Sequence, residues 1–198
     1  MNVSKKGEYA LRTLIDLGLA AEAGRPLLQV SELADKERLP HKFLELIMSD
    51  LRDGGFVKSE RGKYGGYRLG KPARAITIGS IVRAIDGPLA PIRCVSQTAY
   101  EPCSCPDETH CGLRMLMLDV RNATSAILDR YTLADVVGVT VAKLSRNNLP
   151  LPFSNEAKKA PLARIPFRRL RKAKKRPGQH RLSEAEGVLY TLLGDYTI

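Results

Sequence analysis

The chain contains 198 residues, of which 43% are hydrophobic, with four Cys and no Trp. This composition excludes a disordered, collagenous or disulfide-framework protein, and the length does not suit a multi-domain enzyme. The formal net charge of +11, from 32 Lys and Arg against 21 Asp and Glu, favours a polyanionic partner, either nucleic acid or an anionic membrane surface.

The positive charge is concentrated near the C-terminus. Residues 143–198 hold 13 Lys or Arg and four Asp or Glu, a net +9, so residues 1–142 carry only +2. Eight of the thirteen residues in 164–176 are basic, and hydrophobic periodicity fades across the segment. Clustered like charge among prolines is typical of a flexible arm. We therefore predict that 143–198 is a basic, disordered tail, whose last apolar stretch is too short to span a membrane.

The first part of the chain carries three helix patterns in close succession. Apolar residues recur at spacings of three and four over 9–21, which predicts a first helix. Ser31 suits the N-terminal cap of a second, short helix over 32–36. Pro40 suits the first turn of a third helix, whose core-facing stripe lies within 43–51.

The outer face of the third helix carries the polar residues His41, Lys42, Glu45 and Arg52. A tightly joined pair of short helices, the second with mixed polar groups, is the arrangement that places a recognition helix in the major groove of DNA. These four side chains are therefore candidate DNA contacts. For His41 and Arg52, a solvated surface position is the alternative.

A glycine-rich basic hairpin is predicted next. Residues 56–58 and 67–69 have the pattern of two strands, and 61–66 form a turn that contains three Gly, Arg61 and Lys63. Glycines let the backbone approach a phosphate or a narrow groove, and the two cations can contact DNA there. This pattern favours a β-wing over a plain solvated hairpin, because it directly follows the two-helix pattern.

A cluster of cysteines follows a predicted helix over 77–87. The N-terminus offers no secretory signal, because Asp16 interrupts the early apolar stretch, so we expect a cytoplasmic protein without structural disulfides. Thiolates brought together by a loop suit a soft metal or an iron–sulfur cluster, while a zinc-stapled loop or free thiols are the alternatives. The four candidates are Cys94, Cys103, Cys105 and Cys111.

A long apolar stripe begins directly after the cysteines. The pattern from Leu113 to Tyr131 predicts a helix of about five turns. This is more apolar length than one domain of this size needs. Thr132 and Asp135 then suit the start of a last short helix through Val137.

Several of these segments are similar to those of a known family. The similarity is carried by 43–52, by 54–57 and most specifically by Arg61-Gly62 with the run from Gly65 to Leu69. On these residues 1–137 resemble the winged-helix regulators of the IscR, NsrR and RirA type, the Rrf-two family. The resemblance implies a mainly α fold with a small β-wing, and a homodimer that binds a palindromic operator in double-stranded DNA.

The resemblance and the composition together divide the chain into four parts. We expect a winged helix-turn-helix DNA-binding domain over 1–90 and a cysteine-rich sensor loop over 91–112. A dimerisation helix and a short terminal helix are expected over 113–142, followed by the basic tail over 143–198.

The resemblance also implies a ligand set. Family members use three Cys in this loop, commonly with five residues between the last two, as between Cys105 and Cys111. Cys94, Cys105 and Cys111 are thus the implied ligands of an iron–sulfur cluster, of either 2Fe–2S or 4Fe–4S type. Cys103 departs from the three-Cys pattern and is an alternative to Cys105, a fourth ligand or a nearby thiol. Glu8 matches an acidic ligand that some members supply from the partner subunit.

The resulting hypothesis is a non-enzymatic transcription regulator, in the first instance a repressor, with no membrane partner. Its operator affinity would be controlled by an iron–sulfur cluster that senses iron, redox state or nitric oxide. By resemblance, Lys42, Glu45 and Arg61 are the base or groove contacts. The alternatives are a zinc- or thiol-based DNA-binding regulator and a small iron–sulfur electron carrier. The basic tail is expected to add salt-sensitive affinity for flanking DNA.

Overall fold

The computed structural model describes residues 3–62 and 64–154. The elements are α1 (Lys5–Glu22), α2 (Val30–Glu37), α3 (His41–Asp53), β1 (Val57–Glu60), β2 (Gly66–Leu69), η1 (Ala73–Ala75), α4 (Ile78–Asp86), η2 (Arg93–Val95), α5 (Gly112–Arg130) and α6 (Leu133–Arg146). The predicted fold class, mainly helical with one small antiparallel wing, is confirmed. No helix within the described ranges is long and apolar enough to cross a bilayer.

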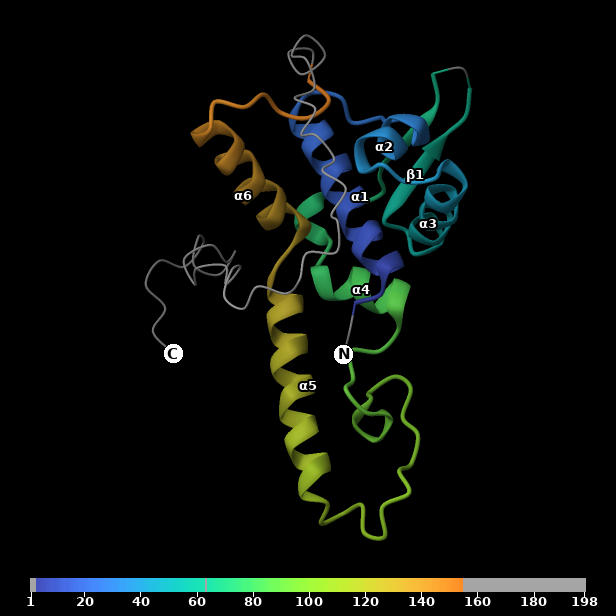
Figure 1. Cartoon of the computed structure of the whole chain (residues 1–198), viewed down its shortest axis with the longest axis vertical. Helices are drawn as coiled ribbons and strands as arrows, with labels where there is room; N and C mark the ends of the chain where they lie inside the picture. The colour runs from blue at the N-terminus through green and yellow to red at the C-terminus, as the bar shows by residue number, and fades with distance from the viewer. Residues whose placement is uncertain (1–2, 63, 155–198) are drawn as a thin grey trace, which may run out of the picture.

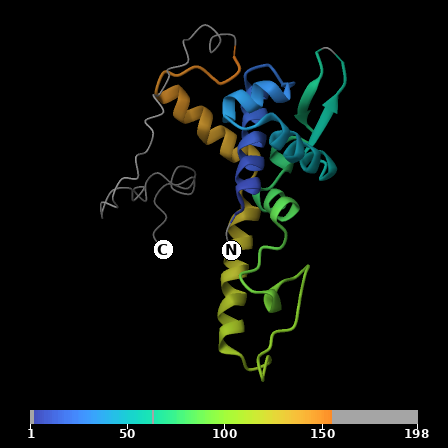
Figure 2. The ribbon, with the colours of Figure 1, turned by 45° about the vertical axis from the view of Figure 1, so that its right-hand side comes forward.

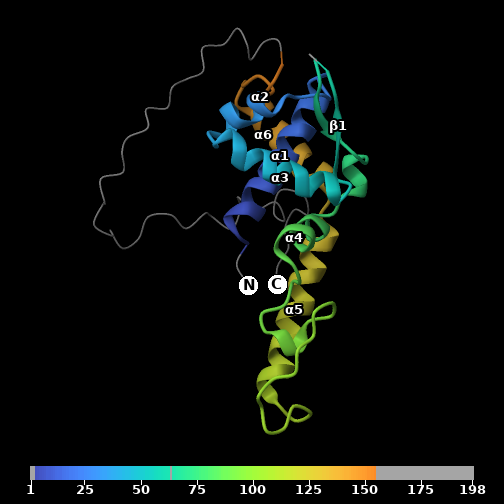
Figure 3. The same cartoon turned by 90° about the vertical axis from the view of Figure 1, so that its right-hand side faces the viewer.

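The elements form two parts of unlike shape. α1 to α4, α6 and the two strands pack together at one end, while α5 and the loop from η2 to Cys111 extend away from them (Figure 1). Turned views show the same separation, with the wing and the cysteine loop at opposite ends of the molecule (Figures 2 and 3). The part that bears the wing is therefore physically separate from the part that bears the cysteines.

The hydrophobic core surrounds α1, which packs against α2, α3, α4, α6 and β2. Ser4 caps this helix, because its Oγ accepts a hydrogen bond from the Gly7 N–H at 3.0 Å. The apolar stripes predicted for the first and third helices both face this core. The largest fully buried side chains are Leu14, Leu17, Leu28, Leu33, Leu44, Ile47, Met48, Leu51, Val57, Ile76, Ile81 and Leu133.

The start of α2 differs from the prediction. The cap position is Gln29, and Ser31 lies inside the first helical turn. The Gln29 N–H donates to the Glu32 carboxylate at 3.1 Å. A glutamate three residues after the cap can reach back to satisfy that otherwise unpaired donor, which a serine inside the turn does not. The prediction that Ser31 caps this helix was therefore wrong.

The predicted wing is confirmed, with β1 and β2 paired antiparallel from Val57 opposite Leu69 to Glu60 opposite Gly66. A third backbone segment supports its base. The Tyr67 N–H donates to the Leu28 carbonyl at 2.7 Å, and the Leu28 N–H donates back at 3.0 Å. A Cβ at Gly66 would lie 2.4 Å from the Leu28 oxygen, so this close approach requires glycine.

The last helix is longer than the prediction, which ended it at Val137. α6 continues to Arg146, so the segment expected as a tail from 143 begins inside a helix. Gly138 and the β-branched residues around it lower the intrinsic helix propensity, which weakened the sequence signal. Packing against α1 overrides that preference, because Gly18 allows Val137 to approach so closely that an added Cβ would lie 2.6 Å from its side chain.

Two leucines of α3 provide a matched test of this packing. Leu44 is fully buried, whereas Leu46 is 63% exposed on the same helix. We expect Leu44→Ala to lower the free energy of unfolding by about 2–5 kcal/mol, because it leaves a cavity in the core. Leu46→Ala should change it by less than about 0.5 kcal/mol. Urea denaturation followed by circular dichroism measures both, and equal losses would contradict the orientation of α3.

Candidate functional site

The outer face of α3 presents the predicted polar residues to solvent. His41, Lys42, Glu45 and Arg52 are all exposed. His41 Nδ1 lies 3.3 Å from Glu45 Oε1, and the Arg52 guanidinium contacts Asp53 at 3.3 Å and donates to Ser49 at 3.0 Å. The face is therefore partly pre-ordered by contacts along the helix, and Arg52 is directed toward its own C-terminal turn.

The wing turn exposes Arg61, while Lys63 lies outside the described residues. Arg68, on β2, forms an ion pair with Glu60 of β1 at 2.6 Å, so it stabilises the hairpin. Two exposed apolar side chains were missed by the sequence reasoning. Leu46 projects from the recognition helix, and Tyr64 of the wing turn is 81% exposed. Their signals were a leucine outside the core stripe and an aromatic residue inside a glycine-rich turn.

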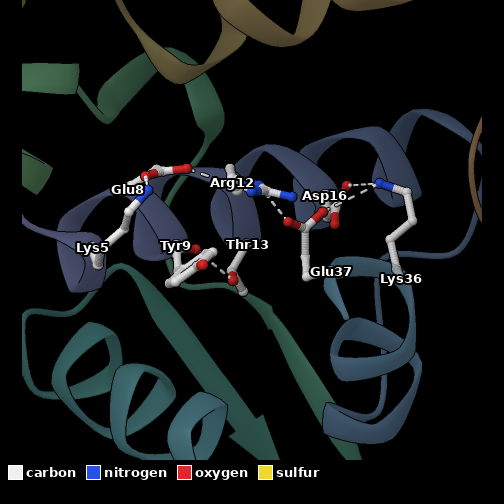
Figure 4. Close-up of polar contacts among 8 residues, drawn as sticks. All are labelled: Lys5, Glu8, Tyr9, Arg12, Thr13, Asp16, Lys36 and Glu37. Atoms are coloured by element: carbon white, nitrogen blue, oxygen red, sulfur yellow. Dashed lines mark hydrogen bonds and ion pairs between the residues drawn. The ribbon is translucent and has the colours of Figure 1, made fainter. Parts of the chain in front are cut away.

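Glu8 lies in a line of charged groups that joins α1 to α2 (Figure 4). Its carboxylate accepts from Lys5 Nζ at 2.6 Å, which lowers its pKa, and it lies 3.6 Å from Arg12. Arg12 Nε in turn lies 2.5 Å from the Glu37 carboxylate at the end of α2. Within one chain Glu8 thus belongs to the part that bears the wing, and it is absent from the side chains that line the cysteine pocket.

Asp16 is the most deeply buried member of this line, with 3% of its surface exposed. Lys36 Nζ donates to Asp16 Oδ1 at 2.9 Å and lies 3.5 Å from Glu37. Asp16 Oδ2 is buried without a hydrogen-bond partner in the described part of the chain. Burial raises the pKa of the Asp16 carboxyl to about 6, against the opposing effect of the Lys36 ammonium.

All four cysteines line one pocket of about 260 Å³. The loop between η2 and α5 lies at the end of the molecule away from the wing (Figure 1). Cys94 is buried, Cys103 and Cys111 are partly buried, and Cys105 is exposed. The pocket thus gathers thiols that lie up to 17 positions apart in the sequence. Its other lining residues are Ile92, Arg93, Glu101, Pro102, Leu113 and Arg114.

The thiols interact with one another in this pocket. Burial raises the pKa of Cys94, and its contact with Cys103 adds to the rise. Hydrogen bonds from Cys105 lower the pKa of Cys103, while hydrogen bonds with Cys103 and Cys111 raise the pKa of Cys105 to about 12. Four sulfur donors fit a soft metal or an iron–sulfur cluster in their chemistry. Over 3–62 and 64–154 no three such side chains are already arranged around a metal position.

The cysteine pocket is joined directly to α5. Cys111 occupies the cap position of this helix, and its carbonyl accepts from the Met115 N–H at 3.1 Å. Two arginines of α5 also hold the other side of the loop. Arg114 Nε donates to the Cys94 carbonyl at 3.4 Å, and Arg121 Nη1 donates to the Val95 carbonyl at 2.9 Å.

α5 has no buried residue within the single chain. Five apolar side chains of the predicted stripe and its border are 41–58% exposed. An apolar surface of this extent, on a helix that projects from the core, is typical of a protein–protein interface. The exposed residues are Leu113, Met115, Leu116, Val120 and Ile127.

A recognition helix and a basic wing on one part, with a cysteine loop attached to an unpartnered helix, define a winged-helix DNA-binding regulator. The family model named Rrf2 and described as an iron-dependent transcriptional regulator matches residues 3–138. The chain therefore belongs to the Rrf2 family of transcriptional regulators.

Named relatives agree with this assignment. An rrf2-like HTH-type regulator from Rhodobacter capsulatus is 40% identical over 146 residues, which cover 72% of this chain and 97% of that protein. CymR from Bacillus subtilis is 36% identical over 140 residues, covering 71% and 92%. IscR from Yersinia pseudotuberculosis is 33% identical over 138 residues, covering 69% and 79%. All three are named as regulators and none as an enzyme.

Two solved structures have the same fold. CymR, described as the global cysteine regulator of Bacillus subtilis, superimposes with a TM-score of 0.59 at 33% identity, covering 70% of this chain and 98% of that one. IscR from T. potens superimposes with a TM-score of 0.54 at 27% identity, covering 71% and 88%. The fold is thus shared with two differently named transcriptional regulators, CymR and IscR.

The buried Asp16 carboxyl makes stability depend on pH. Because its pKa rises from 3.8 to about 6 on folding, the native state retains this proton more strongly, and its contribution to stability falls as pH rises through that window. Asp16→Asn removes this decrease in stability with rising pH, because the amide does not titrate. We expect the variant's stability relative to the native chain to increase between pH 4 and 7 by up to roughly 3 kcal/mol.

Urea denaturation at several pH values measures this difference. The exposed Asp35 of α2 provides the control, since Asp35→Asn removes a carboxyl that stays in water. A flat difference for Asp16→Asn would show that Lys36 cancels the effect of burial on the Asp16 pKa, and a difference that decreases with pH would show that Lys36 outweighs burial.

Proposed function

We propose that the protein is a homodimeric repressor that binds a palindromic operator, and that an iron–sulfur cluster at the cysteine loop controls its affinity. The observation that carries the proposal is the single pocket in which four thiols meet the first turn of α5. The proposal is supported by the match to a family described as iron-dependent and by IscR among the relatives.

DNA contacts are assigned to α3 and the wing. Lys42 can donate to guanine or to a phosphate, and Glu45 can accept from cytosine or exclude other bases. Arg61 in the exposed wing turn can enter the neighbouring groove, as Lys63 can from the same turn by its place in the sequence. Leu46, exposed on the same face as these polar residues, can contact a thymine methyl group.

A second copy of the chain is the proposed partner of α5. The exposed apolar side chains of this helix need a covering surface, and pairing with the same face of another copy supplies one. Such a pair sets the distance between two recognition helices. A two-fold symmetric dimer then requires a two-fold symmetric operator, with half-sites about one helical turn or a multiple of it apart.

Cys94, Cys105 and Cys111 are the proposed cluster ligands, with Cys103 as the alternative to Cys105 or as the fourth. Glu8 is proposed as a ligand only from the partner subunit, because it does not line the cysteine pocket of its own chain. Bound at these thiolates, an iron–sulfur cluster supplies sensitivity to iron, oxidants or nitric oxide.

The chain's own contacts explain how a change in the loop reaches DNA. Arg114 and Arg121 fix the carbonyls of Cys94 and Val95 to α5, so a loop that changes shape pulls on this helix. At the other end of α5, Asp129 pairs with Arg83 of α4. Tilting α5 against its mate would therefore alter the separation of the two wings.

A second candidate function is a thiol-based regulator without a cluster. It is favoured by the mutual contacts of the thiols and by the exposed Cys105. CymR of Staphylococcus aureus, one of the structural relatives, has a solved structure described as an oxidized form. A zinc-stapled loop uses the same donors. An electron carrier would leave the recognition helix and the wing without a role.

Anaerobic purification from iron-supplied cells distinguishes these candidates. We expect a brown protein with thiolate-to-iron absorbance and with iron and sulfide bound. Cys94→Ser and Cys111→Ser should abolish the colour, whereas only one of Cys103→Ser and Cys105→Ser should do so if one of them is not a ligand. A colourless preparation without iron and sulfide would reject the cluster and leave the thiol or zinc candidate, with DNA binding unaffected.

The wing assignment predicts the effect of one substitution. Arg61→Ala should weaken operator binding and relax sequence preference by roughly 1–3 kcal/mol if the guanidinium contacts a base. The exposed Arg130 at the end of α5 is the matched control, since Arg130→Ala removes the same charge outside the winged helix. Fluorescence anisotropy at several salt concentrations measures both, and unchanged affinity for Arg61→Ala would remove this residue from the contacts.

A further inference from the structure

The loop that carries the cysteines is also crossed by contacts between charged and aromatic side chains. Tyr100 belongs to the first limb of the loop, which follows η2, and Glu108 to the second limb, which precedes α5. Tyr100 Oη donates to the Glu108 carboxylate at 2.8 Å, and Arg114 Nε of α5 lies 3.1 Å from the same carboxylate. Both limbs and the first turn of α5 therefore meet at Glu108. Tyr100, Glu108 and Arg114 are called the loop clasp below.

The clasp closes the part of the loop that holds two of the thiols. Cys103 and Cys105 both lie between the two clasp residues of the loop. The contact of Tyr100 with Glu108 thus closes a ring of chain that contains both thiols. The described chain from 97 to 111 contains no helix or strand, and backbone of this kind opens at low cost unless other contacts hold it. The clasp therefore limits the positions that Cys103 and Cys105 can take.

Glu108 supports the pocket from outside rather than lining it. Arg114 is among the residues that line the pocket with the four thiols, whereas Glu108 and Tyr100 are not. Burial and the contact with Cys103 raise the pKa of Cys94, and the nearby Glu108 carboxylate adds to the rise. Glu108 thus lies close to the thiols while its own carboxylate is engaged by the other clasp residues. Groups in such a position orient the residues that contact a bound metal or cluster.

The neighbouring Asp107 makes a contact of a different kind. Its carboxylate lies 2.7 Å from Nδ1 of His110, three residues along the same limb, and its side chain is 58% exposed. The side chain of Glu108 is 28% exposed, and its partners belong to the other limb and to α5. An exposed pair within one limb contributes little to the stability of the whole loop. Asp107→Asn is therefore a control that removes the same charge from the same limb and leaves the clasp intact.

We propose that Glu108 is a positioning residue, which holds the four-thiol pocket in its shape and ties that shape to α5. The inference rests on the proposed function and deepens it, because it names the residue that joins the second limb of the loop to the helix. Arg114 and Arg121 hold the first limb through the carbonyls of Cys94 and Val95. Since Glu108 pairs with the same Arg114, the two limbs move together with α5.

Iron release from the anaerobically purified full-length protein tests this proposal. Loss of a group that orients ligands typically weakens metal binding about 10–100-fold, so Glu108→Gln should lose its thiolate-to-iron absorbance to a ferrous chelator at least about tenfold faster than the native chain. Tyr100→Phe should be faster by a smaller factor, because it keeps the ion pair with Arg114. Asp107→Asn should release iron at the native rate. The spectrum before release should be the same in every variant, because the ligands are unchanged.

Thiol reactivity of the reduced, cluster-free protein gives a second measurement that does not need a cluster. Glu108→Gln and Tyr100→Phe should both react with iodoacetamide faster than the native chain, and Asp107→Asn should not. The reagent is uncharged and Tyr100→Phe removes no charge, so an increase in both variants reports an opened loop rather than an altered charge. Circular dichroism confirms that each variant folds.

The two assays separate failure of the inference from failure of the proposed function. Native rates for Glu108→Gln in both assays would overturn the inference, and so would an altered cluster spectrum, which would make Glu108 a ligand. A native chain that holds no cluster would contradict the proposed cluster. In that case the clasp is supported if iodoacetamide reactivity rises in Glu108→Gln and Tyr100→Phe, and it is overturned if the reactivity stays at the native rate.

Discussion

The attachment of the first turn of α1 is the constraint on which the rest of the structure depends. Ser4 contacts Asp86 of α4 through its backbone N–H at 2.9 Å and its hydroxyl at 2.5 Å, and Lys6 pairs with Asp50 of the recognition helix. A Cβ at Gly7 would collide with Asp86, so only glycine permits this contact. One helical turn thus links α3 to α4, and through α4 to α5, which gives the cysteine loop a continuous packed route to the proposed DNA-reading helix.

The sequence predicted the elements whose local signals agree with their packing. The apolar stripe of α3 and the glycine-rich wing appear where periodicity and turn chemistry placed them. Three features were not predictable in the same way. The cap at Gln29 depends on the Glu32 side chain, which reaches back to the Gln29 N–H. The extension of α6 depends on close packing of Val137 against Gly18. The return of the chain to α2 depends on the contact of Phe153 with Lys36, 117 residues away in sequence. The last two are tertiary effects that override or lack a local pattern, whereas the cap is a local contact at a position where Ser31 offered the more usual capping residue.

The candidate site was likewise predictable from the sequence only in part. Spacing within one loop was sufficient to predict that the four cysteines share a pocket. It could not decide between Cys103 and Cys105, because both line that pocket and share hydrogen bonds, so their roles depend on the bound group. The proposed role of Glu8 requires a second subunit, and the sequence pattern of one chain does not show how two subunits are arranged. Leu46 and Tyr64 were missed because single apolar residues are common on protein surfaces, so a leucine outside the core stripe or a tyrosine in a turn does not by itself indicate a contact.

The uneven charge has a consequence for regulation under the proposed arrangement. Residues 1–142 carry only +2, so specific binding must come from a few placed groups such as Lys42 and Arg61. If the basic tail contacts flanking DNA as the sequence predicts, its cations in 164–176 would raise operator and non-specific affinity by the same factor, because phosphate contacts do not depend on sequence. The discrimination that we propose for the cysteine loop would therefore be independent of these cations.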